Sequence, residues 1–298
     1  NREQLIGDVK RSGDIGRASL LRKLSPGDPT LARVCDELLM QRKDADPEDR
    51  RIAEYIVSEI RNGSVLQLGI GAVPNSIGKM LAESDIRDLG GHSEVLVDAF
   101  MNLYYAGKLT NNKTRDKGLS VYTAAVGSKA LYDFIDDNPI CCCAPVDYVN
   151  NVHTISEIDN FISINSCIGL DLFGQVCSES AGYRQVSGTG GQLDFVQGAF
   201  ASKNGKSFMC THSTRRDSNG KLHSLIHPVL PAGSIVTTPR AAVNYVVTEF
   251  GAVNLKGKST WQRAEMLISI AHPDFREDLI REAEKMGIWR NTSKIEYL

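Results

Sequence analysis

The sequence feature that most constrains the fold is a pair of short apolar runs separated by one helix-length segment. The first run leads into a glycine turn, Leu66-Gln-Leu-Gly-Ile-Gly-Ala-Val-Pro-Asn75, and the second reads Gly91-His-Ser-Glu-Val-Leu-Val-Asp98. The segment between them, Ser76 to Ile86, has the length of a single helix. This order predicts a β–α–β unit whose two strands lie parallel in one sheet.

Glu94 stands near the start of the second predicted strand. If the glycine turn and Glu94 both lie at strand ends, free backbone N–H groups and a carboxylate share one sheet edge. Such a combination can supply the nucleophile and the oxyanion hole of an acyl-transfer site. The alternative is that Glu94 is an ordinary solvated or ion-paired glutamate without a catalytic role. The same two interpretations apply to Glu179. We interpret His92 as a structural residue.

Composition and charge exclude several classes of protein. The chain has 298 residues, of which 42% are hydrophobic and 23% charged, which suits one large or two medium globular domains. A net charge of −2 offers no basic surface for nucleic acid. No apolar run approaches the roughly 18 residues that span a bilayer. Because the chain begins with Asn1 and lacks a signal-peptide pattern, we expect a cytoplasmic protein, and one that is a piece of something longer.

The seven cysteines do not form a disulfide or zinc framework. Cys141, Cys142 and Cys143 are adjacent and cannot all pair, and no Cys-x-x-Cys motif has a matching partner. We therefore expect buried free thiols in a reducing compartment, and no metal site.

Helix-like and strand-like segments alternate along the rest of the chain. Residues 1–45 are polar and helix-like and predict a docking or linking segment, and residues 46–298 predict an α/β domain. Predicted strands are 65–69, 120–125, 161–168, 207–210, 234–237 and 245–249, and predicted helices are 46–63, 128–135, 261–271 and 274–286. Asn219-Gly220 predicts a hairpin. The alternation predicts an open α/β sheet.

The glycine-containing motifs do not match common nucleotide or hydrolase signatures. Gly69 and Gly71 lack the third glycine of a dinucleotide loop, so a plain tight turn is favoured over a nicotinamide site. Neither the Gly-x-Ser-x-Gly elbow of serine hydrolases nor the P-loop lysine pattern occurs. Three glycines within residues 188–191 precede a helix-like run, which predicts a place where the backbone closely approaches another group.

Several longer motifs have a family resemblance. They are residues 66–75, 92–98, 164–167, 171–176, 187–195, 256–264 and 270–276. Together they span roughly residues 50 to 290 and resemble the acetyl-CoA hydrolase/transferase group of class I CoA-transferases. The resemblance is greatest to the butyryl-CoA:acetate and 4-hydroxybutyrate CoA-transferases of that family.

The resemblance implies an open α/β/α sandwich of the CoA-transferase type, with an active site between two related domains. It implies that Glu94 is the catalytic nucleophile and that coenzyme A is a substrate and covalent intermediate, with no tightly bound cofactor. The implied partners are an acyl-CoA and a short-chain carboxylate, in a homo-oligomer. The implied CoA-binding positions are Gly69, Ile70, Gly71, Ala72, Val73, Ile168, Gly191 and Lys206.

The sequence departs from the family pattern in three ways. Glu94 lies earlier in the chain than in the family, so residues 46–298 would be the C-terminal catalytic domain and the N-terminal domain would be largely absent. Three alternatives follow: the chain needs a partner that supplies this domain, it is a truncated or rearranged product, or it has lost transferase activity. Gly169 stands where relatives often carry Glu, and Leu225 where they often carry Arg. We favour a CoA-transferase acting between a short-chain acyl-CoA, such as butyryl-CoA, and acetate. A non-catalytic CoA-binding subunit and an acyl-CoA hydrolase remain the alternatives.

Overall fold

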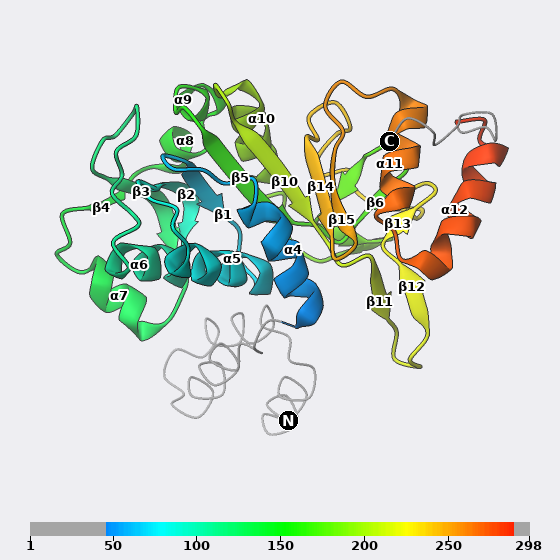
Figure 1. Ribbon diagram of the computed structural model, residues 1–298, viewed down its shortest axis with the longest axis horizontal. Coiled ribbons are helices and arrows are strands. Elements are labelled where there is room, and N and C mark those ends of the chain that lie inside the picture. The colour runs from blue at the N-terminus through cyan, green and yellow to red at the C-terminus, as the bar shows by residue number, and fades with distance from the viewer. Residues whose placement is uncertain (1–45, 289–298) are drawn as a thin grey trace. The chain divides into compact units, whose positions relative to one another are not determined.

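The computed structural model describes residues 46–288, so the helical segment expected over residues 1–45 lies outside the described residues. An eight-stranded sheet organises this part of the chain, in the order β15-β14-β10-β5-β1-β2-β3-β4 (Figure 1). Its strands are β1 Val65–Leu68, β2 Gly90–Leu96, β3 Ser120–Ala125, β4 Cys141–Cys143, β5 Phe161–Ser166, β10 Lys206–Cys210, β14 Tyr245–Thr248 and β15 Gly251–Asn254. All neighbouring strands are parallel except β14 and β15.

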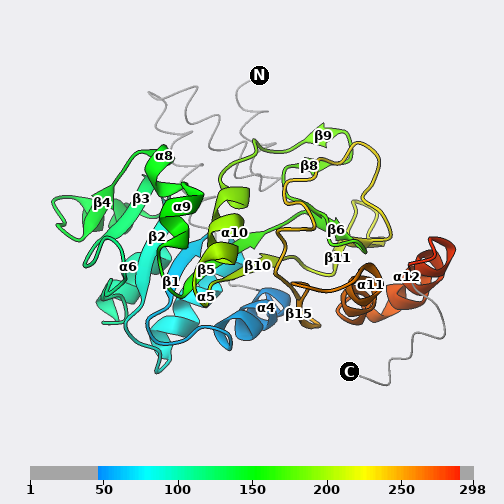
Figure 2. The same ribbon diagram turned by 90° about the horizontal axis from the view of Figure 1, so that it is seen from above.

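Helices cover both faces of this sheet (Figures 1 and 2). One face carries α4 Pro47–Val57, α5 Ala72–Glu83 and α6 Asp98–Tyr105, and the other carries α8 Val146–Val149, α9 Val152–Ser156 and α10 Gln192–Ala201. Leu66 and Leu68 of β1 join the core under the first group, whereas Val65 joins the core under the second. Every residue of β1 is therefore buried, as expected for a central strand covered on both faces. The open α/β fold predicted from the sequence is confirmed.

The remaining described strands form three smaller sheets that are separate from the large one. A three-stranded sheet joins β6 Gly169–Asp171, β7 Val176–Cys177 and β13 Ile226–His227. Two hairpins pair β8 Ser180–Ala181 with β9 Arg184–Gln185, and β11 Thr214–Arg216 with β12 Leu222–Ser224. The second hairpin contains Asn219-Gly220 and confirms that prediction. The remaining helices are α7 Lys129–Ile135, α11 Thr260–Ser269 and α12 Pro273–Lys285.

Two helix boundaries differ from the predicted ones. Helix α4 ends at Val57 and not at residue 63, because the Ser58 hydroxyl donates to the Tyr55 carbonyl and the chain turns. Helix α5 begins at Ala72 and not at Ser76, since Gly71, with φ of 142°, turns the chain directly from β1 into the helix. Pro74 is accommodated there because the first turn of a helix needs no N–H donor.

One predicted strand is wrong, and strand β15 of the large sheet was not predicted. Residues 234–237 do not form a strand; instead Thr237 and Thr238 donate their N–H groups to the Val176 carbonyl, with a single bridge between Val176 and Thr238. Strand β15 was missed, because the two residues that connect it to β14, Glu249 and Phe250, lack the usual hairpin turn signal.

The strand order creates a switch point at β1. From β1 the chain moves outward through β2, β3 and β4, and then returns to place β5 on the other side of β1. In open α/β sheets ligands bind in the crevice outside the carboxyl ends of the strands at such a point. The loops that follow β1, β2 and β5 are therefore the expected place for a site.

The sequence predicted that the chain has no membrane-spanning segment and that its cysteines are free thiols. Within residues 46–288, no helix has the length and apolar character to cross a membrane. The six described cysteines are free thiols. Cys177 and Cys210 are buried as expected, whereas Cys143 is exposed because it lies on β4, the edge strand of the large sheet.

Candidate active site

Glu94 lies in the second half of β2, which corrects the expectation that it stands near the start of the strand. The strand begins at Gly90, because Gly90 and Gly91 already pair with Val65 and Leu66 of β1. Continuing this register by three residues brings Glu94 level with Gly69, the first residue after β1. Glu94 and the glycine turn therefore share the carboxyl edge of the sheet, as the site requires.

The carboxylate of Glu94 is partly exposed and opens into a pocket of about 440 Å³. Asn150, which follows α8, donates from Nδ2 to Oε2 of Glu94 over 3.1 Å. The pocket is lined by Glu94, Val146, Asp147, Asn150, Asn151, Gly190 and Asp194. Three carboxylates thus face one open pocket at the sheet edge.

His92 holds the segment that carries Asn150. Its side chain is fully buried and its Nε2 lies 2.8 Å from the Val149 carbonyl, which can only accept a hydrogen bond. Burial lowers the pKa of His92 to about 4, so the ring is neutral at physiological pH and carries its proton on Nε2. Phe161 and Phe195 pack edge-on against the imidazole. These contacts give His92 a structural role, as interpreted from the sequence.

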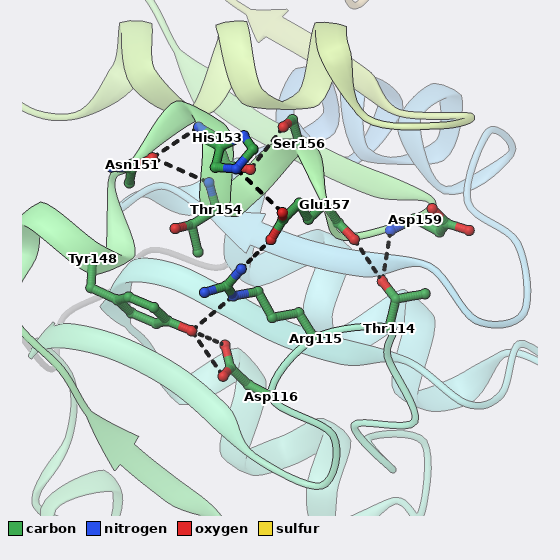
Figure 3. A network of polar contacts seen from close by, with 10 residues as sticks. All are labelled: Thr114, Arg115, Asp116, Tyr148, Asn151, His153, Thr154, Ser156, Glu157 and Asp159. Atoms are coloured by element: carbon green, nitrogen blue, oxygen red, sulfur yellow. Dashed lines mark hydrogen bonds and ion pairs between the residues drawn. The ribbon is translucent and has the colours of Figure 1, made fainter.

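A second polar network holds the residues next to Asn150 in place (Figure 3). The Tyr148 hydroxyl donates to Asp116 over 2.9 Å and accepts from Arg115 Nε over 3.0 Å. Arg115 also forms an ion pair with Glu157, which follows α9. Asn151 caps α9 by accepting from the next backbone N–H groups. Asn150 is therefore held between two anchored neighbours, which limits the positions that its amide can take.

Gly191 brings the start of α10 against Glu94. A Cβ atom at this position would lie 2.2 Å from Glu94 Oε2 and 2.2 Å from Asn150 Nδ2. The backbone φ of Gly191 is −93°, which any residue adopts, so the glycine is needed for space alone. The close approach predicted for the glycine loop is thus an approach to the Glu94 carboxylate.

The turn after β1 presents backbone donors at the same edge. Gly71 is the N-cap of α5 and has no side chain to satisfy the first N–H groups of the helix. Ile70 is 56% exposed, and Gly71 and Ala72 are also exposed, whereas Val73 turns into the core. A helix start of this kind favours negative charge on a ligand.

Two predicted CoA-binding residues lie away from Glu94. Ile168 follows β5 and lines a separate pocket of about 570 Å³. Lys206 is the first residue of β10, at the amino edge of the sheet, and its Nζ lies 2.6 Å from Glu59 Oε2. The structure therefore groups Gly69–Val73 and Gly191 with Glu94, but not Ile168 or Lys206.

Gly169 and Leu225, the two positions where the sequence departs from its relatives, are neighbours. A Cβ on Gly169 would lie 3.1 Å from the Leu225 carbonyl, and both residues line the 570 Å³ pocket with Ile168. They lie on a different part of the carboxyl side from Glu94, since the lining residues of the two pockets do not overlap.

Sequence reasoning missed Asn150 and Asp194. Asn150 lies 56 positions from Glu94, in a polar segment with no recognisable motif. Asp194 belongs to the motif of residues 187–195, in which only the glycines were singled out. Burial, together with the nearby charge of Glu94, raises the pKa of Asp194.

Comparison with known sequences identifies the family. The acetyl-CoA hydrolase/transferase C-terminal domain matches residues 127–283. Butyryl-CoA:acetate CoA-transferase of Anaerostipes caccae is 54% identical over 247 residues, which cover 83% of this chain and 55% of that protein. The 4-hydroxybutyrate coenzyme A transferase of Clostridium kluyveri is 48% identical over 80% of this chain and 54% of that protein.

Solved structures agree with the sequence matches. RipA from Yersinia pestis superposes with a TM-score of 0.77 at 44% identity, over 83% of this chain and 55% of that one. A 4-hydroxybutyrate CoA-transferase from Porphyromonas gingivalis gives a TM-score of 0.69 at 38% identity, over 81% and 56% of the two chains. The chain spans about half the length of the relatives it matches. On these matches and on its open α/β fold, the chain belongs to the acetyl-CoA hydrolase/transferase family.

Proposed function

We propose that this chain carries the nucleophile of a CoA-transferase, which moves CoA from a short-chain acyl-CoA to acetate or a similar carboxylate. Butyryl-CoA is the donor that we expect. The observation that carries the proposal is the Glu94 carboxylate itself, which is partly exposed in an open pocket, held by Asn150, and set against the backbone of Gly191. A carboxylate in this setting is a nucleophile for a thioester carbonyl.

The proposed reaction passes through two covalent intermediates on Glu94. The carboxylate attacks the acyl carbonyl carbon, the C–S bond breaks, and CoA leaves as a thiolate from a mixed anhydride. The thiolate then attacks the glutamyl carbonyl carbon, which releases the first acid as a carboxylate and leaves a glutamyl-CoA thioester. An incoming carboxylate reverses both steps. Because one thioester is exchanged for another, the chemistry needs no ATP.

Backbone groups near Glu94 are the proposed stabilisers of the oxyanion. The N–H groups at the start of α5, after Gly71, lie on the same sheet edge as Glu94 and are free of side-chain caps. We assign CoA contacts to Gly69–Val73 and Gly191 on this geometry, and keep Ile168 and Lys206 as weaker candidates. Anchoring the distant parts of CoA contributes binding energy to the step at the thioester.

A second candidate function is supported by the charges of the pocket. Glu94, Asp147 and Asp194 line it, with no lysine, arginine or histidine among the described lining residues. A carboxylate acceptor needs a compensating cation there, so we propose that a partner N-terminal domain or a second copy of the chain completes the site. Without that partner the chain would be a CoA-binding subunit. Hydrolysis is the further alternative, because water can reach an intermediate in an open pocket.

Free thiols support a reducing compartment as the place of action. Cys143 is exposed on an edge strand and is unpaired, as are the other described cysteines. Disulfides are rare where thioredoxin and glutathione keep thiols reduced, so we propose a cytoplasmic location.

The deciding experiment is intact-mass spectrometry after incubation with butyryl-CoA. A transferase gives a CoA adduct on the wild-type chain, none on Glu94→Ala, and loss of the adduct when acetate is added. Binding of CoA without any adduct supports the subunit function. Release of butyrate without acetate, at the rate of adduct turnover, supports hydrolysis.

A further inference from the structure

Asp194, on helix α10, lines the same pocket as Glu94, on strand β2. It stands three residues after Gly191, the N-cap of α10, and these two positions adjoin at the start of a helix. Because the space for a Cβ on Gly191 is occupied by the Glu94 carboxylate, the first turn of α10 lies against Glu94. Asp194 and Glu94 are both among the residues that line the pocket. The helix start therefore places a second carboxylate next to the proposed nucleophile.

No cation among the described lining residues of the pocket pairs with this second carboxylate. Within residues 46–288, the side chain of Asp194 forms no hydrogen bond or ion pair, and the third acid of the pocket, Asp147 on α8, adds further negative charge. In the described part of the chain, the Glu94 side chain accepts one hydrogen bond, from the uncharged amide of Asn150. The N-terminal dipole of α10 partly offsets the charge of Asp194. Burial and the charge of Glu94 both raise the pKa of Asp194.

We propose that Asp194 is a positioning residue that acts through Glu94, because its negative charge destabilises the free Glu94 carboxylate relative to the covalent glutamyl intermediates. The proposal rests on the proposed function and deepens it. On this proposal, Asp194 shifts the equilibrium of the first half-reaction towards the glutamyl-CoA enzyme without contacting the substrate.

The charge balance of the half-reaction gives the physical reason. At the start Glu94 carries one negative charge beside Asp194. When its oxygen bonds to the acyl carbon, the C–S bond breaks and that charge moves to the CoA thiolate. When the thiolate sulfur bonds to the glutamyl carbon, the C–O bond of the anhydride breaks and the charge leaves on the released carboxylate. The glutamyl-CoA enzyme is thus free of the repulsion that the resting enzyme contains.

The test compares Asp194→Asn with Asp274→Asn. Asp274 is also in the first turn of a helix, α12, but is 74% exposed and lies outside the pocket, so it controls for effects on helix stability. Each protein is equilibrated with the same ratio of butyryl-CoA to butyrate, and the ratio of glutamyl-CoA enzyme to free enzyme is measured by intact mass. We expect Asp194→Asn to lower this ratio severalfold and Asp274→Asn to leave it unchanged.

A second measurement needs no turnover. The titration of Asp194, followed by carboxyl NMR with labelled aspartate, is compared between wild type and Glu94→Gln. Removing the charge of Glu94 should lower the pKa of Asp194, since that charge is one of the two causes that raise it.

The outcomes separate this inference from the proposed function. A wild-type adduct whose equilibrium is the same in Asp194→Asn and Asp274→Asn overturns the role of Asp194 and leaves the transferase standing. Absence of any adduct in wild type contradicts the proposed function. If no adduct forms, the NMR titration still tests the repulsion between Asp194 and Glu94. An Asp194 pKa that is the same in wild type and Glu94→Gln overturns this repulsion, and a lower pKa in Glu94→Gln supports it.

Discussion

Replacing Gly191 by alanine tests the geometry of the site most directly. The added Cβ would lie 2.2 Å from both Glu94 Oε2 and Asn150 Nδ2, well inside van der Waals contact. The backbone can accept alanine, because φ is −93°. The carboxylate and the amide must therefore move apart by ~1 Å, the distance needed to restore contacts of normal length.

The size of the effect follows from the contacts that are lost. The hydrogen bond from Asn150 to Glu94, 3.1 Å long, ends at a charged acceptor, and such bonds are worth about 1.5–3 kcal/mol. Misplacing a reacting group by ~1 Å costs on the order of 10²-fold in rate. The free energy of unfolding should fall by about 1–3 kcal/mol, because the variant loses this hydrogen bond and alanine is a poorer N-cap than glycine. The chain should therefore remain folded while adduct formation slows on the order of 10²-fold.

The assay measures the rate of CoA-adduct formation and the urea unfolding curve for Gly191→Ala and for Gly188→Ala. Gly188 lies in the exposed loop that precedes Gly191, and a Cβ there would meet no atom within 4 Å. We expect Gly188→Ala to behave as wild type in both measurements. The reasoning is refuted if Gly191→Ala forms the adduct at the wild-type rate, or if it loses more than about 3 kcal/mol of stability.

Three other predictions follow from the same part of the fold. Asn150→Ala should slow adduct formation by on the order of 10-fold or more, the kinetic equivalent of one hydrogen bond to a charged group, with a nearly unchanged unfolding midpoint; an unchanged rate would show that the amide does not position Glu94. Because burial lowers the pKa of His92 from 6.5 to about 4, the unfolded chain binds the proton more tightly, so its contribution to stability is complete above pH 6.5 and is lost as the pH falls towards 4. That contribution is roughly 3 kcal/mol. Urea unfolding at pH 7 and pH 4.5 should show that wild type loses this stability at the lower pH and that His92→Gln does not. The same loss in both proteins would contradict the lowered pKa of His92. Gly198→Ala would place a Cβ 2.4 Å from Ile155 Cγ2 and should destabilise the α9–α10 contact by about 1–3 kcal/mol in urea; a variant as stable as wild type would contradict this packing.

Short-range patterns in the sequence were sufficient for much of the fold. The run from Val65 through the glycine turn to the next strand predicted β1, α5 and β2, because apolar runs and glycine act over a few residues. Asn219-Gly220 predicted the β11–β12 hairpin for the same reason. Element ends were less well predicted, since Gly71 and Ser58 set them through local hydrogen bonds and backbone angles.

Segments that depend on distant partners could not be predicted. Residues 234–237 have the composition of a strand, but their backbone donors go to unrelated partners: the N–H of Ile235 donates to the Ser180 hydroxyl and that of Thr237 to the Val176 carbonyl. Lys206 looked available to a ligand, and only the fold places Glu59 against its amino group. In each case the partner comes from another part of the chain, which local patterns do not encode.

The same division applies to the site. The sequence by itself determined the chemistry, because it supplied a carboxylate on a strand, a glycine turn after the neighbouring strand and a glycine-rich helix start. Only the tertiary structure decided which groups meet Glu94. Register places it level with Gly69, the return of β5 beside β1 creates the crevice, and helices from distant segments bring Asn150, Gly191 and Asp194 around the carboxylate. Strand order and helix packing are set by burial of the whole core, so these contacts are properties of the complete fold.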